Sequence, residues 1–128
     1  MIELILPYPP SVNHYKIMGR LRMSKGGKMY REMINSPKTR KYYWEVASIY
    51  RKEGVKSFDS EAILYMVVEV SPPDKRKRDI DGILKVLLDS LQHAACFEDD
   101  YQIAKLTVIR LLPVPEGRIR VVITEKTD

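Results

Sequence analysis

Cysteine and histidine are scarce in this sequence of 128 residues. Cys96 is the only cysteine, which excludes an internal disulfide framework and any cysteine-rich zinc site, and we expect it to be a buried thiol in a reducing compartment. His14 and His93 are far apart in the sequence with no third ligand pattern around them, so histidine-based metal chemistry is not expected. A metal site would therefore depend on carboxylates, which favour a hard cation.

Long apolar runs are missing as well. No stretch approaches the roughly 20 apolar residues that a membrane-spanning helix needs. The first residues, MIELILPYPP, have neither the basic start nor the long apolar region of a signal peptide. Internal repeats, linkers and low-complexity segments are also absent. We therefore expect a cytoplasmic protein without a membrane partner.

The composition is that of a folded, basic protein. Hydrophobic residues make up 45% and charged residues 30% of the chain, and the formal net charge is +5. A chain of this length is long enough for one compact domain with a core, and too short for two ordinary domains. We expect a single domain over residues 1–128, and the positive charge favours a polyanionic partner.

Apolar and turn-forming residues predict a strand, a hairpin and a helix in the first half of the chain. Residues 1–6 are typical of a short strand that ends at the prolines of PYPP. A GG pair lies between β-compatible runs in residues 20–30 and predicts a hairpin whose basic side chains form a solvated face or contact phosphate. Ser36 and Pro37 are typical of a helix start and Gly54 of a helix end.

The second half predicts three strands and another helix. Trp44 and its neighbours in the first helix are expected to pack rather than to stack on bases, because helical spacing already explains them. Residues 61–71 are apolar enough to be a central strand. The runs at residues 104–112 and 118–125 predict a pair of adjacent antiparallel strands, joined by PVPEG. This order favours an α+β fold, a mixed sheet with two helices on one face.

The second helix has the clearest apolar pattern in the chain. Its apolar residues fit helical spacing from its first turn onward, so we expect them to face the core: Ile80, Ile83, Leu84, Leu87, Leu88 and Leu91. The helix is therefore expected to begin beside Asp79 and Asp81.

The stretch DKRKRDIDGILK, residues 74–85, combines four consecutive basic residues with two aspartates at this helix start. The two carboxylates can approach one ion if Asp79 remains extended or caps the helix while Asp81 lies in the first turn. Lys85 would then lie one turn beyond Asp81 on the same exposed side. An ordinary alternative is that Asp79 caps the helix, and that Asp81 pairs with Lys85 and with the helix dipole.

Three observations favour a metal site over that alternative. The KRKR block concentrates positive charge where phosphate could bind. Asp99 and Asp100 follow the helix, at the entrance to the next strand, and we expect the chain to return there beside the helix start if helix and strand pack antiparallel. Three facing carboxylates would repel one another unless a cation neutralised them.

Three segments together resemble one family. LPYPPSVNHY, RDIDGILKVLLDSL and EDDYQI, in this order and over nearly the whole chain, are similar to the RusA family of Holliday junction resolvases. By this resemblance Asp79, Asp81 and Asp100 are the catalytic, metal-binding aspartates and Lys85 is the catalytic lysine. Asp99 is a possible accessory acid. The expected DNA contacts are Lys75, Arg76, Lys77, Arg78 and Asn13.

The resemblance also implies an activity and partners. It implies a homodimeric endonuclease that resolves four-way DNA junctions by paired symmetric nicks, in recombination and repair. Mg²⁺ is the expected cofactor, with Mn²⁺ as a substitute, and no small-molecule cofactor is expected. The sequence departs from the family pattern at two positions, where Gly82 replaces an asparagine and Ala95 replaces a glycine.

Three alternatives remain open at this stage. The chain could be a metal nuclease that prefers flaps or other branched DNA. It could be a weakly catalytic protein that binds branched DNA, if the loss of the asparagine side chain at Gly82 reduces activity. It could also be a domain without any nucleic-acid function, in which the aspartates only begin a helix.

Overall fold

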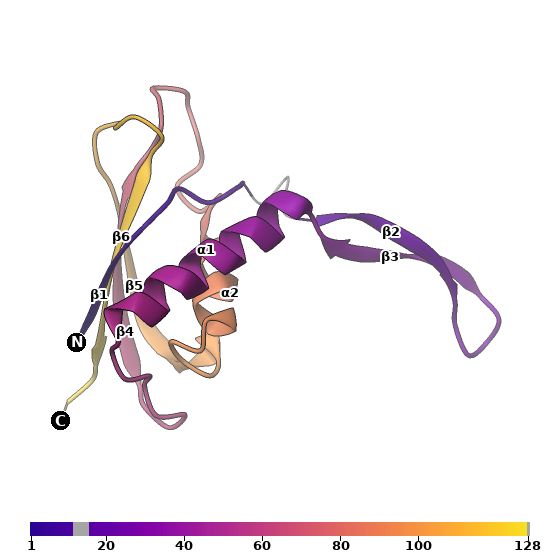
Figure 1. Ribbon diagram of the computed structural model, residues 1–128, viewed down its shortest axis with the longest axis horizontal. Coiled ribbons are helices and arrows are strands. Elements are labelled where there is room, and N and C mark those ends of the chain that lie inside the picture. The colour runs from indigo at the N-terminus through magenta and orange to yellow at the C-terminus, as the bar shows by residue number, and fades with distance from the viewer. Residues whose placement is uncertain (12–15, 128) are drawn as a thin grey trace.

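The computed structural model describes residues 1–11 and 16–127 (Figure 1). Its elements along the chain are β1 (Ile2–Leu6), β2 (Lys16–Met23), β3 (Met29–Asn35), α1 (Pro37–Glu53), β4 (Leu64–Ser71), α2 (Leu84–His93), the short 3₁₀ helix η2 (Asp100–Gln102), β5 (Ile103–Arg110) and β6 (Arg118–Glu125). In the part of the chain described, no helix is long and apolar enough to cross a membrane.

Four strands form a mixed sheet in the order β1-β6-β4-β5. β4 pairs in parallel with β5 and antiparallel with β6, and β6 pairs antiparallel with β1. Alternate residues of β1, β4 and β6 are buried in one apolar core with α1 and α2, so both helices cover the same face. This arrangement confirms the expected α+β fold, and the buried thiol of Cys96, whose pKa burial raises to about 12, confirms its place in the core.

The expected pairing of the last two strands is wrong, because β4 lies between β5 and β6. The connecting segment crosses the end of β4 and hydrogen bonds to it, with the Leu111 amide donating to the Val70 carbonyl and the Val114 amide donating to the Pro72 carbonyl. The chain turns back at Gly117, whose φ of 73° favours glycine. The PVPEG segment is therefore a bridge across a strand rather than a hairpin turn.

The hairpin formed by β2 and β3 is an arm that extends away from the sheet (Figure 1). We call residues 16–35 the arm. Its turn is closed by hydrogen bonds between Ser24 and Lys28, and Gly27 has a φ of 82° there. The two strands pair with each other, and no other helix or strand packs extensively against them in the described part of the chain.

Helix α1 begins and ends where the sequence predicts. The Ser36 hydroxyl accepts a hydrogen bond from the Thr39 amide, Pro37 opens the helix, and Gly54 ends it in the left-handed conformation. The prediction for Trp44 is wrong, since 68% of this residue is exposed. It lies on the solvent side of the helix, opposite the residues that pack on the sheet.

Helix α2 begins later than expected, at Leu84 instead of near Asp79. Ile80 precedes it in a turn and is 44% exposed, so its predicted place in the core is wrong, whereas Ile83, Leu87 and Leu91 are buried as expected. Gly82 provides a physical reason for the late start, because glycine is unfavourable inside a helix by about 1 kcal/mol relative to alanine.

Helix α2 ends in a Schellman motif. The Cys96 amide donates to the Leu91 carbonyl and the Ala95 amide to the Gln92 carbonyl, while Ala95 has a φ of 65°. This left-handed conformation is the one that glycine favours. The substitution of alanine for the family's glycine therefore keeps the helix end but adds backbone strain.

We expect Ala95→Gly to stabilise the protein by about 0.5–1 kcal/mol. Glycine removes the strain of alanine in the left-handed conformation, and this gain exceeds the loss caused by the greater backbone freedom of glycine in the unfolded chain. The melting temperature should rise by about 2–5 °C. Gly54→Ala is the matched opposite change, since Gly54 ends α1 with a φ of 63° and an added Cβ would meet no atom within 4 Å. It should lower the melting temperature. A lower melting temperature for Ala95→Gly would contradict the strain argument.

Candidate functional site

The aspartate pair lies in two successive turns just before α2. The Gly82 amide donates to the Asp79 carbonyl, and the Leu84 amide donates to the Asp81 carbonyl, each over 3.1 Å. Both aspartates thus use their backbone carbonyls to build these turns, and we call residues 79–84 the aspartate turn. Their exposed carboxylates make no hydrogen bond or ion pair with any residue that the structure describes.

This geometry removes the ordinary explanation for the pair. Ile83 occupies the N-cap position of α2 without a side-chain cap, and the first turn contains no acidic residue. Lys85 donates to Asp89 over 3.2 Å, so its ion-pair partner within α2 lies on the side away from Asp81. Neither aspartate is therefore needed to start the helix through its side chain.

Asp99 and Asp100 lie at the other end of α2. The Asp99 carboxylate accepts from the Tyr101 amide over 2.9 Å and caps η2, with the Gln102 side chain completing a capping box. This structural role explains Asp99 without a catalytic function. The Asp100 amide donates to Gln92 Oε1 near the end of α2, and the half-buried Asp100 carboxylate has no partner among the described residues.

Helix α2 separates the three expected metal ligands within one chain. Its ten residues make a helix about 15 Å long, with Asp79 and Asp81 before its first residue and Asp100 beside its last turn. Among the described residues no three acidic, histidine or cysteine side chains are close enough to hold a metal ion. The expectation that Asp99 and Asp100 return beside the helix start is therefore wrong for a single chain.

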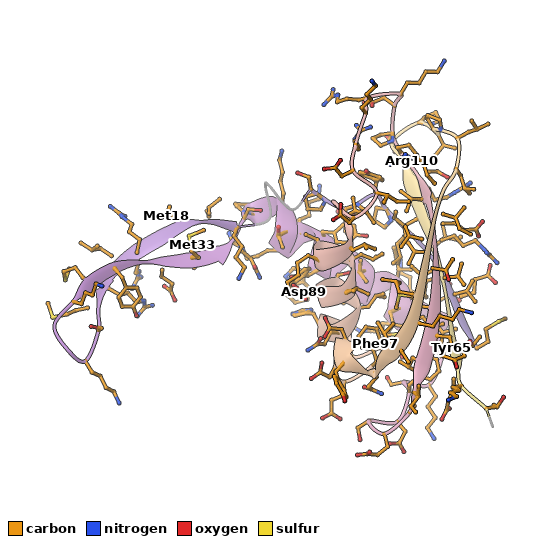
Figure 2. All side chains as sticks on the ribbon, turned by 180° about the vertical axis from the view of Figure 1, so that it is seen from behind. Met18, Met33, Tyr65, Asp89, Phe97 and Arg110 are labelled. Carbon is orange, nitrogen blue, oxygen red and sulfur yellow. The ribbon has the colours of Figure 1, made fainter. Side chains whose placement is uncertain are left out.

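The reason lies in the parallel pairing of β4 and β5. A crossover helix between parallel strands starts where the first strand ends and finishes where the second strand begins. Its two ends therefore lie at opposite ends of the strands. Figure 2 shows Phe97, just after α2, and Arg110, at the end of β5, near opposite ends of the sheet. What returns to the Asp79 turn is therefore the far end of β5.

The basic block, residues 75–78, forms a loop with one inward arginine and three exposed residues, Lys75, Arg76 and Lys77. Arg78 Nη1 donates to Asp74 Oδ1 over 2.7 Å, and the guanidinium lies 5.9 Å from the ring centre of Tyr8. The hydrogen bond from Arg78, followed by one from the Arg76 amide, lowers the pKa of Asp74 to about 2. Arg78 therefore organises the loop, while its three neighbours remain available to contact phosphate.

Sequence reasoning missed three residues that hold this loop in place. Asp74 fixes Arg78, Arg110 Nη2 donates to the Arg78 carbonyl over 2.8 Å, and Tyr8 packs beneath the guanidinium, where burial raises its pKa. Tyr8 belongs to the LPYPP motif, which was the one available signal. The other two are brought in by β5 and by the loop's own turn, which no local pattern reports.

The loop and its neighbours enclose a pocket of about 560 Å³ beside Asp79. Its floor is apolar and its rim is basic, with lining residues Tyr8, Val70, Pro72, Asp74–Asp79, Ile80, Ile83 and Arg110–Pro113. Asp81, Lys85 and Asp100 do not line it. Asn13, the remaining residue expected to contact DNA, lies outside the described residues.

Comparison with known proteins decides the family. The family model described as "Endodeoxyribonuclease RusA" matches residues 7–124. The chain is similar to the crossover junction endodeoxyribonuclease of Enterobacteria phage HK97, with 40% identity over 96% of this chain and 93% of the relative. It is also 30% identical to the enzymes of that name from Escherichia coli and Enterobacteria phage 82, with the same coverage. The chain belongs to the RusA family.

The RusA match spans both ends of α2, so it includes the aspartate turn, Lys85 and Asp100. One departure from the family pattern, Gly82, lies within the aspartate turn. An added Cβ would lie 3.3 Å from the Asp79 carbonyl oxygen, and Gly82 has no positive φ, so the backbone does not require glycine there. The missing asparagine side chain is a loss of one polar group and not a change of the turn.

We predict that Asp74 titrates near pH 2 and that Arg78→Met moves this pKa upward, toward 3.8. The shift should be partial, because the hydrogen bond from the Arg76 amide remains. Since the folded-state pKa is depressed, the pair stabilises the loop above about pH 4, and this contribution disappears as the pH falls through 2. Carboxyl ¹³C titration by NMR measures it.

Lys77→Met is the control for that titration. It removes the same charge from the loop, but Lys77 is not among the partners of Asp74, which are Arg76 and Arg78. It should leave the pKa of Asp74 near 2. A wild-type Asp74 that titrates close to 3.8 would contradict the assigned role of Arg78.

Proposed function

We propose that this protein is a Mg²⁺-dependent endonuclease that resolves four-way DNA junctions by paired, symmetric nicks, in recombination and repair. The proposal rests on one observation, that in a RusA-family chain the carboxylates of Asp79 and Asp81, just before α2, have no partner among the residues that the structure describes. The relatives compared above carry the name crossover junction endodeoxyribonuclease.

The aspartate turn fits part of a magnesium site. Mg²⁺ in phosphate-processing enzymes is commonly held by one or two carboxylates, with waters and substrate phosphate in the remaining positions. Asp79 and Asp81 provide two such carboxylates on the surface. Bound there, Mg²⁺ would activate water and neutralise charge on the departing 3′ oxygen. Among the described residues of the same chain, no third carboxylate reaches this turn.

A second copy of the chain resolves this difficulty. A two-fold axis perpendicular to α2 near its middle would place two α2 helices side by side and antiparallel. The start of each helix would then face the end of the other, so that Asp100 of one copy approaches Asp79 and Asp81 of the other copy. Such a homodimer contains two equivalent sites, one for each of the two opposed strands that a symmetric junction presents.

The other residues of the site have roles that follow from their positions. Lys85, exposed in the first turn of α2, places a positive charge near the phosphate that the aspartates approach. Lys75, Arg76 and Lys77 contact the DNA backbone and give affinity with little sequence information. Arg78 and Asp74 keep the loop in position through their ion pair.

Incubation of purified protein with labelled four-way junction, flap and linear duplex, with and without Mg²⁺, tests this function. We expect paired nicks in the junction only, and only with the metal. Asp81→Asn should bind the junction as wild type does and cut it at least about a hundredfold more slowly, since it removes charge from the metal ligands and leaves the basic loop intact.

Glu61→Gln is the control variant, because it removes one acidic charge from an exposed residue that is not among the proposed metal ligands. It should cut normally. Preferred cleavage of the flap would assign a different branched substrate, and junction binding without cleavage would identify a binding protein. Normal cleavage by Asp81→Asn would remove the aspartate turn from the site.

A further inference from the structure

The arm formed by β2 and β3 has one strongly apolar face. Directly opposite residues of the ribbon share a face, and so do alternate residues along β3. The pairs Met18–Met33 and Met23–Met29, together with Leu21 opposite Arg31, therefore project from the same side. These five apolar residues are each 49–66% exposed. We call them the methionine face, and Figure 2 labels Met18 and Met33 within it.

An exposed apolar face of this kind indicates a binding partner. A two-stranded hairpin is only marginally stable alone in water, and contiguous exposed apolar residues commonly mark binding sites. In the part of the chain described, neither α1, α2 nor the four-stranded sheet packs extensively against the arm. The opposite face carries the Arg22–Glu32 ion pair at 2.9 Å beside Ile17, Ile34 and Tyr30, so that face is of mixed polarity.

The arm also carries the charge excess of the protein. Residues 16–35 contain six basic residues and one acidic residue, a net charge of +5, which equals the net charge of the whole chain. The acid, Glu32, is paired with Arg22. The rest of the chain is formally neutral, so the net positive charge of the protein equals that of the arm, which adds to the local charge of the basic loop.

We propose that the arm is a second DNA-binding element, whose methionine face packs against unstacked bases at a branch point while its basic residues contact phosphates. A two-stranded ribbon fits a DNA groove, and methionine and leucine are among the side chains that insert between base steps. Methionine is flexible and polarizable, so it adapts to any base and reads shape rather than sequence. This inference rests on the proposed recognition of branched DNA and adds a site that is distinct from the aspartate turn.

A second copy of the chain fits this surface less well. Two arms of charge +5 repel each other, and the methionine face carries Lys16 and Arg31 but no acidic residue. A protein partner would need an apolar and acidic surface. DNA at a branch point has both an apolar surface and negative charge, because exposed base faces are apolar and phosphates flank them.

Binding measured in EDTA, so that no strand is cut, tests the arm. The DNA forms are a four-way junction with 2-aminopurine at the branch point and a linear duplex with 2-aminopurine within the same sequence. The triple variant Met18→Thr, Met23→Thr, Met33→Thr should weaken junction binding about tenfold, weaken duplex binding less than about threefold, and abolish the junction-specific change in 2-aminopurine fluorescence. Ile5→Thr, Val55→Thr and Ile63→Thr, three exposed apolar residues of the body, form the matched control and should change none of these.

A second pair of variants tests the charge without touching the apolar face. Lys25→Gln with Lys28→Gln, in the exposed turn of the arm, should weaken binding to both DNA forms and flatten the plot of log K against log salt by about two units. Lys52→Gln with Lys56→Gln, near the end of α1, removes the same charge from the body and should have a smaller effect on the slope.

Three outcomes separate the possibilities. Unchanged junction affinity and fluorescence in the methionine triple variant would overturn the proposal. So would conversion of a dimer to a monomer by that variant in sedimentation, because the arm would then be an interface between copies. If the wild-type protein binds the junction no better than the duplex, the proposed recognition of branched DNA fails. The branch-point role of the arm then fails with it.

Discussion

The parallel pairing of β4 with β5 is the constraint on which the rest of the structure depends. It requires the crossover helix α2 to run from the C-terminal end of β4 back to the N-terminal end of β5, which lie at opposite ends of the strands. The basic loop and the aspartate turn, which link β4 to α2, lie at one end of these strands, and Asp100 lies at the other. The same constraint returns the end of β5 to the basic loop, where Arg110 holds the Arg78 carbonyl.

This division means that a single chain carries two halves of the expected site. The aspartate turn has an adjacent lysine and two carboxylates without partners in the described part of the chain, but the expected third carboxylate, Asp100, is about one helix length away. Two copies related by a two-fold axis would convert the separation within a chain into proximity between chains. The proposed dimer is thus needed both for the symmetry of a junction and for the assembly of each site.

The features predicted correctly from the sequence are those with a local physical cause. The caps of α1 at Ser36 and Gly54, the GG turn of the arm and the apolar β4 strand each depend on residues within a few positions. The pairing of β5 and β6 failed because β4 intervenes between strands that are close in sequence, and local pattern contains no information about that insertion.

The candidate site was predicted in its residues better than in its geometry. Asp79 and Asp81 lie together as expected, in turns instead of a helix, because Gly82 delays the start of α2. Arg78 appeared equivalent to its three basic neighbours, yet its side chain contacts Asp74 and the distant Tyr8, and Arg110 binds its carbonyl. Trp44 failed for a simpler reason, since helical spacing did not decide which side of α1 faces the sheet.

The most direct test of a site shared between two copies is junction cleavage by mixed inactive variants. Asp81→Asn and Asp100→Asn are first purified separately, then unfolded together and refolded so that subunits mix. If each site takes Asp81 from one copy and Asp100 from the other, a mixed dimer contains one intact site, and nicking with Mg²⁺ should reappear in the mixture. If both residues come from the same copy, every site in the mixture is defective, and the absence of nicking would contradict the account.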